Sequence, residues 1–287
     1  MIDDRMAGDS FRLGFRFQRH WDTPMAGAFF CGEVGAGLFL VSMLFGQLPG
    51  MLAGLAIATL GKGILHLAHM GLPGRSWRAI LRPDRSWVSR GLIAIVVLAA
   101  SGTLHVAHVL GGGGDWLGTA LGTMAGAAAV LVMTYQGFAM SHSAAIGLWS
   151  TAMMPFASLL YAATSGVVLT LLLHRLPESA PADDTLVAAA MVLLPALLIM
   201  LASMLHAAYH GSPGARLSAE LLMRGRYAAA FHGTVLAIGL IVPLAALALG
   251  ADSTFARLLA AAGVLTGFYA FRVLVFKAGV YEPVMSF

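Results

Sequence analysis

Two charged residues, Glu33 and Lys62, stand inside long apolar runs of the sequence. Counted from the same end of the two runs, both would lie roughly 12–14 Å deep in a membrane at the helical rise per residue. A charge at that depth is costly, so it usually has a partner and often marks a functional site. Because a short turn joins the two runs, the two side chains can meet. They fit either a structural ion pair or a polar pocket and proton path that opens to one side.

Two histidines continue from Lys62 toward the end of its run. Lys62, His66 and His69 are spaced i, i+4 and i+7, which places them on one helical face. Histidine donates hydrogen bonds and transfers protons near neutral pH. A single histidine at the end of a span is often only a satisfied interfacial residue, but three polar groups beside an intramembrane acid favour a site. We therefore expect at least one of them to bind a ligand or transfer protons.

A basic loop follows these histidines and begins at Arg75. Arginine and tryptophan residues are interleaved along it, namely Arg78, Arg82, Arg85, Trp77 and Trp87. Both residue types are favoured in binding hot spots, so the loop is a candidate docking surface for a partner subunit. Loop arginines also set membrane topology, and that role alone would explain them. The segment GRSWRA lacks the glycine spacing and the Lys–Ser/Thr pair of a phosphate-binding loop.

The composition shows where these residues must be held. Of 287 residues, 59% are hydrophobic and 10% are charged, whereas soluble domains average about half apolar and about a quarter charged. This indicates an integral membrane protein. The sequence pI of 9.6 is explained by charges at span ends and does not point to nucleic acid. The single cysteine, Cys31, excludes a disulfide framework, and also an iron–sulfur cluster or structural zinc site held by this chain alone.

Eight continuous apolar runs predict eight membrane-spanning helices and no strands. They cover residues 25–46, 51–71, 88–110, 117–140, 149–173, 186–209, 227–249 and 255–276. Several connections are short, so consecutive helices are expected to be antiparallel neighbours. With eight spans both termini share one side. That side carries most of the basic residues, so the positive-inside rule places both termini in the cytoplasm. Residues 1–24 mix Phe with Arg, which suits an interfacial segment.

A short internal repeat predicts two halves. Four residues recur at a constant offset of 140: His66, Gly71, Pro73 and Gly74 as His206, Gly211, Pro213 and Gly214. The offset equals four helices, so we predict an all-α fold of two four-helix halves related by a parallel repeat. The halves would cover residues 25–140, with the ligand site, and 149–277, followed by a tail at 278–287. Chance similarity between two helix ends remains the alternative.

Three functions suit a membrane chain with these residues. In a quinone site, His, Lys or Arg would hydrogen-bond the quinone carbonyls while a carboxylate moves protons. In a b-type cytochrome, two axial histidines would hold haem, and His66 with His206 or His232 is a candidate pair. The histidines lie near the membrane surface, however, and no second pair completes a two-haem arrangement. The repeat also suits a transporter. We favour the quinone site and place it in the first half, because the second copy lacks a lysine in register with Lys62.

The loop sequence carries a family resemblance. HMGLPGRSWRAILRPDRSWVSR resembles the His-Leu-Gly-x-Pro-x-Arg and Ser-Trp-x-Ser stretches of the NrfD/DmsC family, the membrane subunits of polysulfide reductase and DMSO reductase complexes. The resemblance implies eight helices in two halves without haem, in the bacterial inner membrane. Such a subunit exchanges electrons between menaquinone or ubiquinone and a four-cluster iron–sulfur subunit, which connects to a molybdopterin catalytic subunit. It is not itself catalytic for the main substrate.

The resemblance also implies roles for particular residues. The quinol-reactive histidine would be His69, the loop arginine Arg75, and the intramembrane polar residue of the first span Glu33. Tyr135 opens a run, YQGFAMS followed by Trp and Pro, that is similar to the family's fourth and fifth spans. Where DMSO reductase anchors carry a glutamate, this chain has Gly91. The predicted cytoplasmic orientation of this loop resembles that of the cytoplasm-facing branch of the family. This branch includes the membrane anchors of sulfite dehydrogenase and of phenylacetyl-CoA:acceptor oxidoreductase.

Overall fold

The computed structural model describes residues 15–174 and 180–282. Within these residues, eight helices are long and apolar enough to cross a membrane. They are Thr23–Leu44, Leu48–His69, Trp87–Leu110, Trp116–Ser141, Met153–Leu173, Asp183–Tyr209, Ala228–Gly250 and Thr254–Lys277. The predicted all-α membrane fold is therefore confirmed, and the helix ends lie within a few residues of the predicted ones. The part of the N-terminal segment at residues 1–14 lies outside the described residues.

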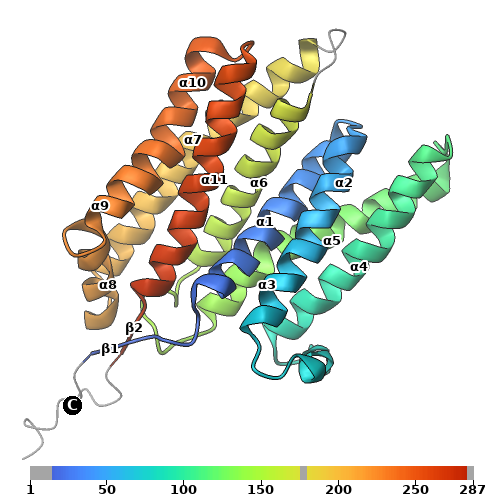
Figure 1. The fold of residues 1–287 in the computed structure, drawn as a ribbon. Helices are drawn as coiled ribbons and strands as arrows, with labels where there is room; N and C mark the ends of the chain where they lie inside the picture. Colours follow the sequence, from blue (N-terminus) through green and yellow to red (C-terminus); the bar gives the residue numbers. More distant parts are fainter. Residues whose placement is uncertain (1–14, 175–179, 283–287) are drawn as a thin grey trace, which may run out of the picture.

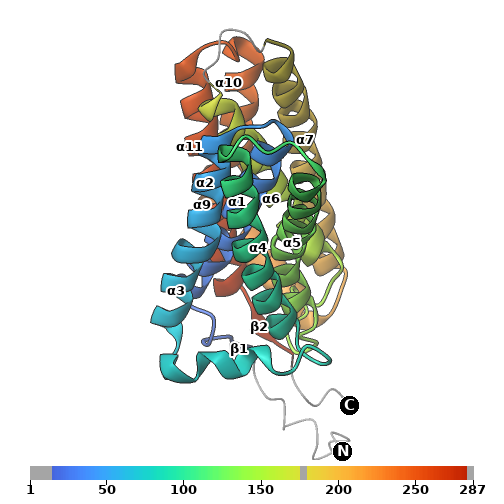
Figure 2. The same ribbon diagram turned by 90° about the vertical axis from the view of Figure 1, so that its right-hand side faces the viewer.

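The first four spans form one group of helices (Figure 1). They are α1 (Thr23–Leu44), the second span, α4 (Trp87–Leu110) and α5 (Trp116–Ser141). The second span is composite: α2 (Leu48–Ala56), a π-helical segment η1 (Ile57–Gly61) and α3 (Lys62–His69). A short 3₁₀ helix, η2 (Pro73–Ile80), follows it and lies across the end of the bundle (Figure 2).

The remaining spans form the second group. They are α6 (Met153–Leu173), α7 (Ala180–Tyr209), a composite seventh span and α11 (Thr254–Lys277). The seventh span comprises α9 (Ala228–Ala230), a π-helical η3 (Phe231–Ile241) and α10 (Val242–Gly250). The short α8 (Pro213–Met223) precedes it. Proline thus begins both η2 and α8, at positions that the proposed repeat relates, but the repeat itself stays a prediction.

Helix α1 joins the two groups. It packs against α2, α3 and α5 of its own half and against α6 and α11 of the other. Gly37 of α1 and Gly166 of α6 allow the closest approach, because a Cβ at either position would overlap the backbone of the facing helix. Small residues of this kind permit close packing of membrane helices. The most buried helix of the protein, α1, therefore carries the intramembrane Glu33.

The ends of the described chain meet at one end of the bundle. Strand β1 (Arg16–Phe17) pairs antiparallel with β2 (Val280–Tyr281). Glu282 then accepts hydrogen bonds from the hydroxyl of Ser212 and from the backbone N–H groups of Gly214 and Ala215, at the start of α8. We call the end that holds β1, β2, η2 and α8 the terminal face. The opposite face carries the turns before α2, α5 and α11.

Candidate functional site

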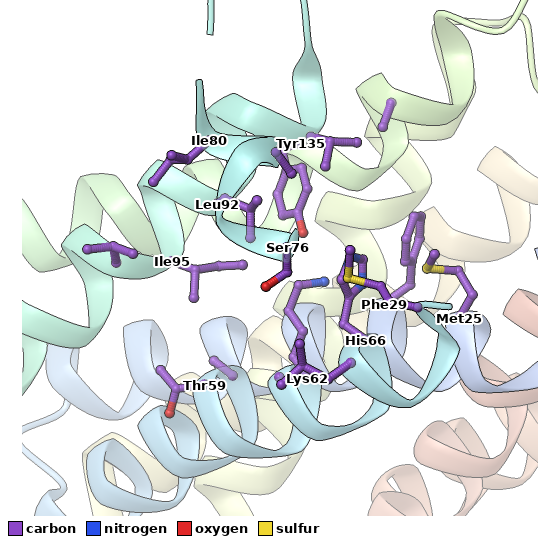
Figure 3. A pocket seen from close by; sticks show the side chains of 18 of the residues that line it. Met25, Phe29, Thr59, Lys62, His66, Ser76, Ile80, Leu92, Ile95 and Tyr135 are labelled. Atoms are coloured by element: carbon purple, nitrogen blue, oxygen red, sulfur yellow. The ribbon is translucent and has the colours of Figure 1, made fainter. Parts of the chain in front are cut away.

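A cavity of about 490 Å³ opens among α1, the second span, η2, α4 and α5, near the terminal face. Its walls are mostly apolar, with Phe29 from α1, Leu92 and Ile95 from α4, and Ile80 from η2. Lys62, His66 and Tyr135 from the predicted set line it, together with Trp77 (Figure 3). An apolar pocket with a few convergent polar groups is the usual form of a small-molecule site.

Lys62 lies at the back of this cavity with only 3% of its surface exposed. Its Nζ donates to the backbone oxygen of Ala28 at 3.2 Å and to Oε1 of Gln136 at 2.9 Å. The ring centroids of Phe29 and Tyr135 lie 5.4 and 5.2 Å away, within range of cation–π attraction. An ammonium group has three donors, so one remains for a ligand.

Gln136 of α5 fixes the orientation of Lys62. Its Nε2 donates to the backbone oxygen of Phe29 at 3.0 Å, so its Oε1 must face Lys62. Gln136 is fully buried, with 0% of its surface exposed. Its hydrogen bonds and those of Lys62 link α1, α3 and α5. Sequence reasoning assigned this residue no role, although a glutamine in the middle of an apolar run was a visible signal. A Cβ at Gly32 would press on both Lys62 and Gln136, so the site requires glycine there.

The other two polar side chains keep unsatisfied hydrogen-bonding atoms. His66 Nδ1 is buried and has no hydrogen-bond partner within the part of the chain that the structure describes. Tyr135 lines the same cavity, and its hydroxyl forms no hydrogen bond within the described residues; its ring packs directly on Gly91, where any Cβ would overlap it. Buried polar atoms without partners are uncommon in native proteins. Together with the spare donor of Lys62, they are suited to a ligand that accepts hydrogen bonds.

His69 and Arg75 do not line this cavity. His69 Nδ1 lies 2.9 Å from Oδ1 of Asp22, and Asp22 also caps α1 by accepting from the N–H of Met25. His69 therefore faces the terminal face one turn beyond His66. Arg75 is exposed in η2. Both residues stand between the cavity and the surface, and neither side chain belongs to the cavity wall.

Glu33 does not form an ion pair with Lys62, contrary to the meeting that the sequence allowed. Its Oε1 and Oε2 instead accept from Nη2 and Nε of Arg272 at 2.6 and 2.9 Å. Nη2 also donates to Ser158 at 2.6 Å. All three residues are 0% exposed. The two residues lie 239 positions apart in the chain, so the sequence did not predict this pair. Glu33 thus lies outside the cavity wall, in the seam between the halves.

The loop residues divide into two kinds. Arg78, Arg82 and Arg85 are exposed at the terminal face, and Trp77 is 60% exposed. Trp87 differs, because it begins α4 and stacks on Phe138 at a centroid distance of 4.3 Å. The guanidinium carbon of Arg90 lies 4.5 Å from the centroid of the Trp87 ring. Trp87 therefore packs α4 on α5, and the exposed docking candidates are the three arginines with Trp77.

The axial histidine pair considered for haem is not brought together. His66 lies on α3, which packs against α1, η1 and η2, whereas His206 lies on α7, which packs against α6, α8, α10 and η3. His206 instead contacts His210, one turn further along α7, with ring centroids 4.6 Å apart. His232 is exposed on η3, and its Nδ1 lies 2.8 Å from the backbone oxygen of Ala228.

The fold is that of a helical membrane protein with several spans. Its cavity has apolar walls with a few polar side chains and lies near the terminal face. No protein-family model matches the chain, and no match to a curated protein was found. The NrfD/DmsC resemblance therefore depends on the quoted motifs alone.

Proposed function

We propose that this protein is a quinone-reactive membrane subunit of the NrfD/DmsC type. It exchanges electrons between membrane menaquinone or ubiquinone and an iron–sulfur subunit docked on the terminal face. A molybdopterin catalytic subunit is the onward partner, as the motif resemblance implies. The excess of arginine at the terminal face favours a cytoplasmic location for this face, and the motif resemblance implies a bacterial inner membrane.

One observation supports this proposal most strongly: three polar side chains that can still bond a ligand line the apolar cavity. Lys62 has one unused N–H, His66 Nδ1 has no partner within the described residues, and Tyr135 has a free hydroxyl there. A quinone has a flat apolar ring, which suits walls of Phe29, Leu92 and Ile95. Its two carbonyl oxygens accept hydrogen bonds, which suits the third N–H of Lys62 and the hydroxyl of Tyr135. The cavity lies within the membrane span, so a hydrophobic ligand reaches it from the lipid.

Oxidation of a quinol releases two electrons and two protons, so the site needs a proton route. His66 in the cavity wall, His69 beyond it and Asp22 at the surface form a sequence of titratable groups toward the terminal face. Asp22 is partly exposed, with 48% of its side chain accessible. In this proposal His66 receives a proton in the cavity, and the His69–Asp22 pair passes it to water.

The test compares two buried tyrosines in the purified, full-length protein in lipid nanodiscs. Binding of water-soluble menaquinone and ubiquinone analogues is followed by quenching of tryptophan fluorescence, since Trp21 and Trp77 line the cavity. Tyr135→Phe removes one hydroxyl and is expected to weaken binding roughly 5- to 10-fold. Tyr161→Phe is the control, because it removes the same hydroxyl from another buried tyrosine, which lies outside the cavity.

Equal quinone affinities for the wild type and both variants would argue against the site. Absence of any saturable quenching would reject the proposed function altogether. Affinity purification of the tagged chain from its native membranes then tests the partner: an iron–sulfur protein with four clusters should co-purify, and its retention should fall when Arg78, Arg82 and Arg85 are replaced together by Gln.

A further inference from the structure

A second cavity, of about 380 Å³, lies at the terminal face on the other side of Trp21. The segment before α1, the turn between α8 and α9, and the last turn of α11 enclose it. Three of its lining residues are cations: Arg19, Arg226 and Lys277. None of them belongs to the quinone cavity or to the arginine loop.

Within the part of the chain that the structure describes, the positive charge of this cavity is not neutralised by carboxylates. All three cations are exposed, and within the described residues none of them forms an ion pair with a carboxylate. The single carboxylate in the lining is Asp22, which is engaged by His69 at 2.9 Å and by the N–H of Met25. The cavity therefore has a surplus of positive charge and suits an anion.

Aromatic contacts hold one of the three cationic groups, that of Arg226, in place. The guanidinium carbon of Arg226 lies 4.5 Å from the ring centroid of Phe17 and 4.7 Å from that of Tyr227. Stacking holds the faces of this planar group and leaves its N–H edges free for an oxyanion. Gln18 stiffens the wall, since its Nε2 donates to the backbone oxygens of Trp21 and Phe276 at 2.9 and 2.8 Å.

The position of the cavity points to a lipid. Arg226 lies two residues before the seventh span, and Lys277 is the last residue of the eighth. Both therefore lie at the level where phospholipid headgroups meet the hydrocarbon region. Val273 lines the cavity one turn below Lys277, and Tyr269, 37% exposed, lies one further turn down the same face. An apolar surface thus continues from the cationic cavity into the membrane.

We propose that this cavity binds the phosphodiester headgroup of an anionic phospholipid, with its acyl chain along Val273 and Tyr269 of α11. Basic pockets at the ends of membrane helices are typical sites for such headgroups. Free phosphate shares the anionic chemistry but would make no use of the apolar surface. The bound lipid would fasten the segment before α1 to the end of α11.

The test measures lipid binding by native mass spectrometry of the full chain released from detergent. Phosphatidylglycerol is compared with phosphatidylcholine of the same acyl chains, and inorganic phosphate is added as a competitor. Phosphatidylglycerol is expected to bind at least about tenfold more tightly than phosphatidylcholine. Arg226→Gln should weaken it roughly fivefold, the effect of one cation near a membrane surface. Arg224→Gln is the matched control, because it removes an equal charge two residues away, outside the cavity.

Three results would overturn the proposal: equal binding of the two lipids, equal effects of Arg226→Gln and Arg224→Gln, or displacement of phosphatidylglycerol by inorganic phosphate. Thermal unfolding establishes that both variants are folded. Should Arg226→Gln unfold, Arg226→Lys retains the charge without the planar stacking, and a loss of affinity in that variant serves the same comparison. Quinone titration of Arg226→Gln, expected to be unchanged, separates this site from the proposed quinone site.

Discussion

Lys62 and Arg272 are both buried cations within the membrane-spanning helices, but their surroundings differ. Arg272 has a carboxylate, Glu33, on two of its nitrogens, together with the hydroxyl of Ser158 and the sulfur of Met140. Lys62 has two neutral acceptors, no carboxylate partner within the described residues, and a cavity in front of it.

This difference separates a structural charge from one available to a ligand. A buried ion pair with all its hydrogen bonds made is closed to other molecules, and its role is to fix how helices meet. A buried cation with an unused donor beside a cavity can still form a hydrogen bond with a molecule that enters the cavity. The seam between α1, α6 and α11 is therefore closed to ligands, whereas the cavity at α3 has room for one.

The largest effect is expected at the seam. Arg272→Met leaves the carboxylate of Glu33 buried without its cation, so the free energy of unfolding should fall by about 3–5 kcal/mol. Thermal unfolding in detergent and the yield of folded protein measure this. The double variant Glu33→Leu with Arg272→Met should recover most of the loss, since apolar residues replace the whole pair. A single variant as stable as the wild type would remove the distinction between the two regions.

Lys62→Met is expected to affect quinone affinity more than stability, the reverse of Arg272→Met. It removes the charged donor in the cavity, so quinone affinity should fall about 10- to 100-fold. No carboxylate is left unpaired, so the loss of stability should be smaller than that of Arg272→Met. Quinone titration and thermal unfolding of the same preparation give both numbers. If Lys62→Met unfolds the protein while quinone affinity of the folded fraction is normal, Lys62 is structural as well.

Gly91→Ala sharpens the comparison inside the first half. A methyl group at this position would overlap the ring of Tyr135, so the ring must move and the hydroxyl with it. Overpacking of this kind lowers stability by about 1–3 kcal/mol, and quinone affinity should fall in parallel. Gly233→Ala is the control, because nothing lies within 4 Å of a Cβ there. Unchanged quinone binding in Gly91→Ala would show that the Tyr135 hydroxyl is not needed.

The smallest effect is expected on the face opposite the termini, far from both regions. Asp115 caps α5, and the N–H of Gly118, with smaller contributions from His108 and Leu117, holds the pKa of Asp115 below its usual value. A depressed carboxyl pKa stabilises the folded state above the unfolded pKa, and the stabilisation disappears as the pH falls through the folded value. Asp115→Ala should therefore lower the melting temperature by a few degrees at most at pH 7.

The difference between Asp115→Ala and the wild type should shrink as the pH drops below about 4. Asp252→Ala, which removes an exposed carboxylate from the same face, is the control of equal charge for this pH series. A melting-temperature difference for Asp115→Ala that grew on acidification would contradict the assigned direction of the pKa shift.

The sequence predicted the helices well, because membrane spans are long, continuous apolar runs. Each span can be recognised from its own residues alone. It also placed Lys62 and His66 on one face of one helix, and both residues line the cavity. It could not predict the partner of Glu33, because Arg272 lies 239 residues away and helix packing decides which faces meet. The same limit explains why Gln136 was overlooked and why His69 was expected in the cavity that His66 lines.

The pairing of Glu33 with Arg272 also has a consequence for how the protein is made. Among the eight described spans, Glu33 lies in the first in chain order and Arg272 in the last. During insertion the acidic side chain enters the bilayer before Arg272 is synthesised. The ion pair can form only after the seven following spans have been made. Closure of this pair is thus a late event in biogenesis, and chains that stop short of α11 retain an unneutralised acid in their innermost helix.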